Sequence, residues 1–222
     1  MIVFIIIYLA ALCCYFYTRT SDNIKYRAIN KYFMATMYLG LAIVTFLNKY
    51  DFASYQTLLM AALILAWLGD IFLVFDFGRG GDFFLAGNIC FVLFEQIILV
   101  DKGGYRFGDF AWTYVVAGLM LAFAIFATGK WPEKIKMEKM RWPMMFYLSS
   151  IFMHGITGLA LIIMMPGTAY EMLGLGSFLF MISDIDLTLY RFVFNNNKWL
   201  VRLNSLTYFG GLLLIVLSTV YA

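Results

Sequence analysis

The sequence has little charge. Only 13% of its 222 residues are Asp, Glu, Lys or Arg, and 64% are hydrophobic, whereas about 25% charged residues are usual in a soluble domain. This composition excludes a soluble globular protein. The net charge of +3 is too small, and too confined to the segments between apolar runs, to indicate a protein that binds nucleic acid.

Cysteine and histidine are also scarce, which argues against several kinds of site. The three cysteines, Cys13, Cys14 and Cys90, lie inside apolar runs and are typical of buried small side chains, not of a disulfide or zinc framework. His154 is the single histidine, and a histidine without a second imidazole is more typical of packing than of metal binding. The chain has no motif of a serine hydrolase, a zinc protease or a nucleotide-binding loop. The sequence therefore predicts neither a metal nor a cofactor.

Apolar runs of membrane-spanning length make up most of the chain, each closed by charge, Gly, Pro or Asn. Because the runs are continuous and not alternating, they favour helices over a closed barrel. The sequence predicts an all-α integral membrane bundle of about eight helices, in a single domain over residues 1–222. The expected helices are Ile2–Tyr17, Lys31–Leu47, Thr57–Phe75, Phe83–Val100, Phe110–Thr128, Met144–Met165, Tyr170–Tyr190 and Leu203–Tyr221.

The basic residues are concentrated in alternate connections between these helices. Of the 16 Lys and Arg residues, 13 lie in the connections that follow the first, third, fifth and seventh helices. Cytoplasmic loops carry the excess of basic residues in membrane proteins. The sequence therefore predicts an even number of spans, with both termini on the non-cytoplasmic side.

Two of the expected helices share a short motif. The segment Leu68–Leu73 reads LGDIFL and the segment Ile182–Leu187 reads ISDIDL, and their aspartates, Asp70 and Asp184, are 114 residues apart. That spacing is about half the chain, as two four-helix repeats of the same orientation would give. Chance similarity is the alternative for so short a motif.

Acidic side chains inside a bilayer cost several kcal/mol and therefore suggest function. Asp70 and Asp184 lie five and six residues before the cytoplasmic ends of their expected helices, so they should lie at a similar depth. Asn88 and Asn204 bring amides to the same level from two further helices. We therefore expect a polar site toward the cytoplasmic side. Two carboxyl groups in a poorly hydrated site cannot both ionise easily, which provides a general acid near neutral pH.

Helical spacing separates the remaining acids from this site. Glu95 follows Asn88 by seven residues and shares its face, but it lies deeper and is equally explained as a protonated packing residue. Asp186 points about 200° away from Asp184 on a helix, so it cannot face the same point. We expect a structural role for Asp186. For Asp70 and Asp184 the alternative is an interhelical hydrogen bond or an ion pair with a nearby basic residue.

Over most of its length the sequence resembles the YhhN-like lysoplasmalogenase family of multi-pass membrane proteins. The order and spacing of several short motifs carry the resemblance. They are Leu68–Leu73, Phe83–Asn88, Phe180–Asp184 and Arg191–Phe192, together with Lys31 at the start of the second helix and Tyr208 in the last.

The resemblance implies hydrolysis of the vinyl ether bond of a lysoplasmalogen to a fatty aldehyde and a glycerophospho-ethanolamine or glycerophospho-choline, without a metal. The partners that the resemblance implies are the lysophospholipid substrate and membrane lipid. Asp70 and Asp184 would share the acid and base roles in an unassigned order, and Lys31 or Arg191 would hold the phosphate. The implied substrate-binding residues are Lys31, Asn88, Ser183, Arg191, Asn204 and Tyr208, with Glu95 and Asp186 in supporting roles.

Two positions depart from the family pattern. Asn88 stands where the family commonly has a histidine, and Tyr32 follows Lys31 where a proline is usual. Asparagine cannot exchange a proton near pH 7, which leaves open a changed substrate, a slower enzyme or a non-catalytic lipid-binding relative. A small-molecule or proton-coupled transporter is the other alternative, and only stretches such as Gly174–Gly176 offer the helix break that many carriers use.

Overall fold

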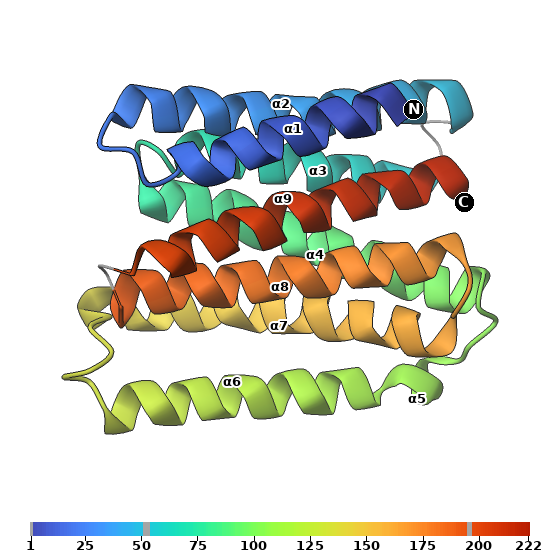
Figure 1. Ribbon diagram of the computed structural model, residues 1–222. Coiled ribbons are helices and arrows are strands. Elements are labelled where there is room, and N and C mark those ends of the chain that lie inside the picture. The colour runs from blue at the N-terminus through green and yellow to red at the C-terminus, as the bar shows by residue number, and fades with distance from the viewer. Residues whose placement is uncertain (1, 51–53, 195–196) are drawn as a thin grey trace.

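The computed structural model describes residues 2–50, 54–194 and 197–222, and these residues form helices and no strand. Eight long helices run along the length of the bundle in alternating directions (Figure 1). The long helices are α1 Ile2–Thr18, α2 Ile24–Lys49, α3 Gln56–Phe72, α4 Phe77–Asp101, α6 Trp112–Lys130, α7 Arg141–Met164, α8 Ala169–Phe192 and α9 Lys198–Tyr221. A short α5, Phe107–Phe110, precedes α6, and a 3-10 helix, Glu138–Met140, precedes α7.

The helices have the length and composition of a multi-pass membrane protein. Six of the described helices are long and apolar enough to cross a membrane: α2, α4, α6 with α5, α7 with its 3-10 turn, α8 and α9. Helices α1 and α3 have 17 residues each, which is at the short end of the range of about 17 to 25 that spans a bilayer. The prediction of an all-α membrane bundle of about eight helices is confirmed.

Three helices begin several residues before the apolar runs that located them. Helix α2 begins at Ile24 because the Asn23 side chain accepts hydrogen bonds from the backbone N–H groups of Lys25 and Tyr26. Asp76 and Asn197 cap α4 and α9 in the same way. Hydrophobicity marks the part of a helix in lipid, whereas the capping side chain sets where the helix starts.

Two other boundaries change the positions of the aspartates along their helices. Helix α3 ends at Phe72 and not at Phe75, so Asp70 lies two residues before its end. Helix α8 continues to Phe192, so Asp184 lies eight residues before its end. The two carboxyl groups nevertheless line one cavity, as described below.

The two halves of the bundle repeat one pattern of helix contacts. Helix α3 packs between α2 and α4, and α8 packs between α7 and α9. Across the halves, α2 contacts α9 and α7 contacts α4. This pattern is consistent with two repeats of the same orientation. The first helix of each half differs, because α1 also contacts α9 whereas α6 lies at the edge of the bundle against α7 (Figure 1).

Glycines bring α8 into close contact with both of its neighbours. A Cβ atom on Gly174 would lie 2.3 Å from the carbonyl oxygen of Gly158 on α7. A Cβ atom on Gly176 would lie 2.6 Å from the carbonyl oxygen of Gly211 on α9. Small residues let membrane helices approach in this way. Helix α8 runs unbroken through Gly174–Gly176, so these glycines serve packing and do not interrupt the helix.

Both termini lie at the same end of the bundle (Figure 1), as an even number of spans requires. The connections that carry most of the basic residues lie at the other end. Which end faces the cytoplasm stays a prediction from the distribution of Lys and Arg.

The close approach of α8 and α9 predicts different effects for two adjacent glycines. Gly211→Ala should destabilise the protein by about 1 to 3 kcal/mol because its Cβ would lie 2.6 Å from the Gly176 carbonyl oxygen and would overpack the interface. Gly210→Ala is the matched control, because a Cβ there meets nothing within 4 Å. Thermal unfolding in detergent measures both variants. Equal unfolding midpoints for the two variants would contradict the packing argument.

The topology predicts which loops a membrane-impermeant thiol reagent reaches from each side. In a background with Cys13, Cys14 and Cys90 replaced by alanine, Lys136→Cys should react only from the cytoplasmic side. Lys102→Cys, at the opposite end of the bundle, should react only from the other side. Both lysines are exposed, so the side of the membrane on which each lies, and not its burial in the protein, decides whether the reagent reaches it. The reverse pattern of labelling would overturn the predicted orientation.

Candidate functional site

A small polar cavity lies where α1, α2, α3, α4, α8 and α9 meet, toward the end that carries the basic connections. Its volume is about 20 Å³, which is enough for about one water molecule. Asp70 and Asp184 both line it, although they are 1% and 4% exposed. The lining residues are Tyr15, Arg19, Lys31, Asp70, Leu73, Phe84, Asp184, Leu187, Asn204, Ser205, Tyr208 and Phe209.

The carboxylate of Asp70 has partners at both of its oxygens. Lys31 Nζ lies 3.1 Å from Oδ1. The Tyr208 hydroxyl donates to Oδ2 at 2.8 Å, and the Tyr38 hydroxyl lies 3.5 Å from the same oxygen. A buried charge is tolerated when it is both paired and hydrogen-bonded. These contacts fit an ionised Asp70 and hold α2, α3 and α9 together at the cavity.

Asp184 has a sparser environment. The Tyr147 hydroxyl of α7 donates to its Oδ2 at 3.1 Å. Within the described ranges, no Lys or Arg lies at ion-pair distance from Asp184. The two aspartates thus share one feature, a tyrosine on the preceding helix, and differ in the cation that only Asp70 has. That difference distinguishes the two carboxyl groups chemically.

Aromatic side chains form one wall of the cavity. The rings of Phe84, Phe180 and Tyr208 pack together with centroids 5.1 to 6.3 Å apart. Phe84 also fills the space beside Gly69, where a Cβ atom would lie 2.8 Å from its ring. The glycine next to Asp70 is therefore explained by packing. It lets the aromatic wall reach the carboxylate, and this wall holds the Tyr208 hydroxyl in place.

The cavity contains five of the residues that the sequence singled out. They are Lys31, Asp70, Asp184, Asn204 and Tyr208. Asn204 Nδ2 donates to the carbonyl oxygen of Ser183 at 2.8 Å. The Ser183 hydroxyl donates to the Phe180 carbonyl of its own helix, so this residue lies next to the cavity without lining it.

The other candidates lie away from the cavity. Arg191 is exposed, and its guanidinium carbon lies 4.7 Å from the ring centroid of Phe77. Asp186 is half-buried on another side of α8 and does not line the cavity. Asn88 is buried between α4 and α7, where its Nδ2 donates to Ser150 Oγ at 3.4 Å.

Glu95 and His154 form a second buried polar pair, one that the sequence interpretation missed. His154 Nε2 lies 3.3 Å from Glu95 Oε1, and both side chains are 0% exposed. The contact satisfies the distance of an ion pair but not the geometry of a hydrogen bond. His154 also stacks on Phe91 with centroids 4.6 Å apart. The described ranges contain no group of three His, Cys, Asp or Glu side chains that suits a metal.

Three further residues of the site were not predicted. Tyr38 and Tyr147 donate to the two aspartates, and their only sequence signal is a polar atom in an apolar run. Arg19 was counted only as a loop charge, although it follows the end of α1 by one residue and lines the cavity.

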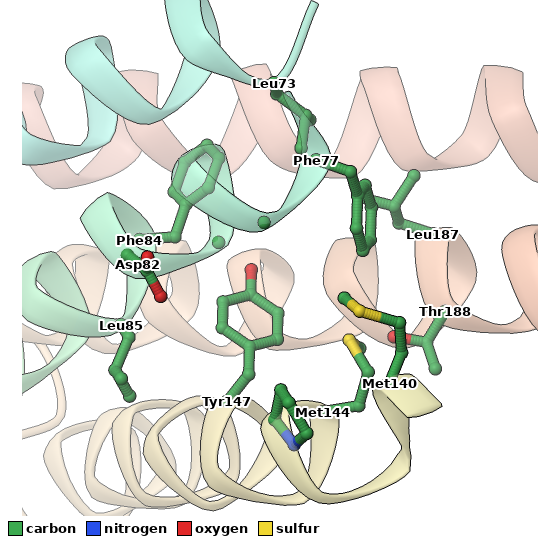
Figure 2. Close-up of a pocket in the computed structure, with 13 residues that line it drawn as sticks. Leu73, Phe77, Asp82, Phe84, Leu85, Met140, Met144, Tyr147, Leu187 and Thr188 are labelled. Atoms are coloured by element: carbon green, nitrogen blue, oxygen red, sulfur yellow. The ribbon is translucent and has the colours of Figure 1, made fainter. Parts of the chain in front are cut away.

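A second, more apolar cavity adjoins the polar one. Its volume is about 80 Å³, and it shares Leu73, Phe84 and Leu187 with the polar cavity. Figure 2 shows Tyr147 rising from α7 between Phe84 and Leu187, with its hydroxyl pointing into the bundle. Tyr147 thus lines the apolar cavity with its ring and contacts Asp184 of the polar cavity with its hydroxyl.

The fold and the cavity define a multi-pass membrane protein with two buried carboxyl groups at one water-sized site. The sequence model of the YhhN family matches residues 26–219, which is most of the chain. The chain therefore belongs to the YhhN family. Comparison with curated proteins and with solved structures gives no match.

The Lys31–Asp70 pair predicts a stability effect that a second substitution reverses. Lys31→Met leaves the Asp70 carboxylate buried without its cation, and breaking a buried pair costs about 3 to 5 kcal/mol. Lys31→Met combined with Asp70→Asn removes both charges and should recover much of the loss. Thermal unfolding in detergent compares the two variants with the wild type. A double variant no more stable than Lys31→Met would refute an ionised pair.

Proposed function

We propose that this protein hydrolyses the vinyl ether bond of lysoplasmalogens, releasing a fatty aldehyde and a glycerophospho-ethanolamine or glycerophospho-choline. The YhhN family includes lysoplasmalogenases, which supports the choice of substrate. The observation that carries the proposal is the pair of carboxyl groups, Asp70 and Asp184, that line one cavity of about 20 Å³ with different partners.

The partners of each carboxyl group suggest its role. Asp184 has no cation beside it in the described residues and accepts one hydrogen bond from Tyr147, so a charge on it would be poorly compensated. We assign it the proton and the role of general acid. Asp70 is paired with Lys31 and accepts from Tyr208. We assign it the carboxylate form and the role of general base.

These roles give a balanced reaction. Asp184 transfers its proton to the β-carbon of the vinyl ether, and the resulting oxocarbenium ion is captured at the neighbouring carbon by water. Asp70 accepts a proton from that water as the hemiacetal forms. Asp70 then protonates the departing glycerol oxygen while the hemiacetal hydroxyl returns its proton to Asp184. Aldehyde and alcohol leave, and both carboxyl groups regain their starting states. Glycosidases use paired carboxyl groups on a similar cation.

The position of the cavity suits a bond just beneath a lipid headgroup. Asp70 is two residues from the end of α3, or about 3 Å along the helix axis. The adjoining cavity is lined largely by apolar residues, among them Phe77, Met140 and Met144. Such a lining is chemically compatible with part of a hydrocarbon chain, and a water molecule fits the polar cavity. The transporter alternative lacks support from α8, which is continuous.

The proposal predicts aldehyde release from a 1-alkenyl lysophospholipid by the purified protein, and none from the saturated 1-alkyl ether. Asp70→Asn and Asp184→Asn should each lower the rate by about 10²- to 10⁴-fold, the usual contribution of a general acid or base. Asp101→Asn is the control, because that aspartate is exposed at the other end of the bundle.

In deuterium oxide the aldehyde should carry one deuterium at C2. In ¹⁸O-water the glycerol oxygen should stay unlabelled.

Two results would refute the mechanism: absence of aldehyde from the wild type, or full activity in both aspartate variants. Uptake of a substrate into sealed vesicles without turnover would favour a carrier instead. Binding without turnover or transport would favour a non-catalytic lipid-binding protein.

A further inference from the structure

Two arginines, one lining the polar cavity and one beside it, have no acidic partner among the described residues. Arg19 lines the cavity, and its Nε is buried without a hydrogen-bond partner. Arg202 Nε is also buried without a partner. Among the described residues, no carboxylate lies at ion-pair distance from either arginine. A buried donor without an acceptor costs about 1 to 3 kcal/mol, so an acceptor that is not part of the chain would stabilise both.

The two arginines belong to one local structure. The Arg202 guanidinium donates to Thr20 Oγ1 at 3.0 Å, and Thr20 directly follows Arg19. Arg202 also precedes Ser205 by three residues on α9, so it lies on the same face one turn closer to the helix start. Ser205 lines the cavity. The connection after α1 and the N-terminal part of α9 therefore form a cationic rim beside the cavity.

The charges inside the cavity leave this rim uncompensated. Lys31 lies 3.1 Å from Asp70 and neutralises it. Asp184, in the mechanism above, holds a proton. The rim thus has two guanidinium groups that face no negative charge of the described chain. Arginine is the side chain best suited to bind a phosphate through two parallel N–H donors.

We propose that Arg19, supported by Arg202, binds the phosphodiester of the substrate headgroup. The assignment rests on the proposed function, and it gives the protein a preference for alkenyl glycerolipids that carry a phosphate. In such a lipid the phosphate and the vinyl ether are both attached to one glycerol unit, so the two groups lie close together. A group that holds the phosphate must therefore adjoin the cavity of the two aspartates, and Arg19 does so. Arg191, exposed over Phe77, does not.

The test compares two substrates that differ only in the phosphate, a 1-alkenyl-glycerophosphoethanolamine and the matching 1-alkenylglycerol, in a phosphate-free maltoside detergent. Arg19→Gln should raise KM for the phospholipid roughly 10- to 100-fold, the effect of losing one or two hydrogen bonds to a charged group. Its rate on the alkenylglycerol should stay within about twofold of the wild-type rate, because the rim does not touch that substrate. Arg19→Lys should recover part of the loss, because it keeps the charge but not the planar fork.

Arg79→Gln is the matched control, because Arg79 is an exposed arginine that pairs with Asp76 beside α4. It should behave as the wild type on both substrates. An equal loss on both substrates in Arg19→Gln would assign Arg19 a structural role. An unchanged KM for the phospholipid would also overturn the proposal.

A binding measurement separates this inference from the proposed function. A saturated 1-alkyl lysophospholipid, which has no bond to cleave, should raise the unfolding temperature of the wild type and of Asp184→Asn by binding the folded state. The phosphate-free 1-alkylglycerol should do so much less. Arg19→Gln should lose the difference between the two ligands. Equal binding of both ligands by the wild type would refute the phosphate site, even if vinyl ether hydrolysis is observed. Tighter binding of the lysophospholipid than of the alkylglycerol, without aldehyde formation, would refute the hydrolase proposal alone.

Discussion

The buried contact between Lys31 and Asp70 is the constraint on which the site depends. A carboxylate that is 1% exposed is costly in a membrane protein unless it is paired and hydrogen-bonded. Lys31 of α2 and Tyr208 of α9 meet both requirements for Asp70 of α3. The same contacts fix the relative positions of three helices. Asp184 of α8 then completes the cavity from the other half of the chain.

The difference between the two carboxyl groups links the fold to the proposed chemistry. Both halves of the bundle place a tyrosine beside an aspartate, Tyr38 with Asp70 and Tyr147 with Asp184. Only the first half adds a lysine. Similar helix arrangements thus produce two unlike carboxyl groups at one site, which is what acid–base chemistry at a single bond requires. Aromatic packing around Tyr208 and the glycine beside Asp70 preserve that arrangement.

The sequence was sufficient to predict the fold class and the burial of Asp70 and Asp184 at one place, whereas their catalytic roles stay a prediction. The apolar runs gave the long helices because lipid requires continuous hydrophobicity, and the scarcity of charge made Asp70 and Asp184 conspicuous. The helix starts at Ile24, Phe77 and Lys198 were missed because capping side chains, not hydrophobicity, set them. These boundaries depend on local hydrogen bonds that composition does not reveal.

Contacts between segments far apart in the chain could not be predicted from the sequence. His154 was interpreted as a packing residue because its partner Glu95 lies on another helix, 59 positions earlier. Arg19 was interpreted as an ordinary loop charge because nothing in the chain shows that the end of α1 meets the start of α9. Spacing along one helix identifies neighbours on that helix, whereas a site built from six helices depends on how they pack.

The order of the paired charges along the chain bears on how the protein enters the bilayer. Helices α2 and α3 are consecutive, so Lys31 and Asp70 can neutralise each other as soon as this hairpin has been synthesised. Neither charge then has to face lipid alone while α8 and α9 are still being made. The short, acid-containing α3 is thus suited to insertion together with the helix before it. Biogenesis and catalysis would rely on the same ion pair.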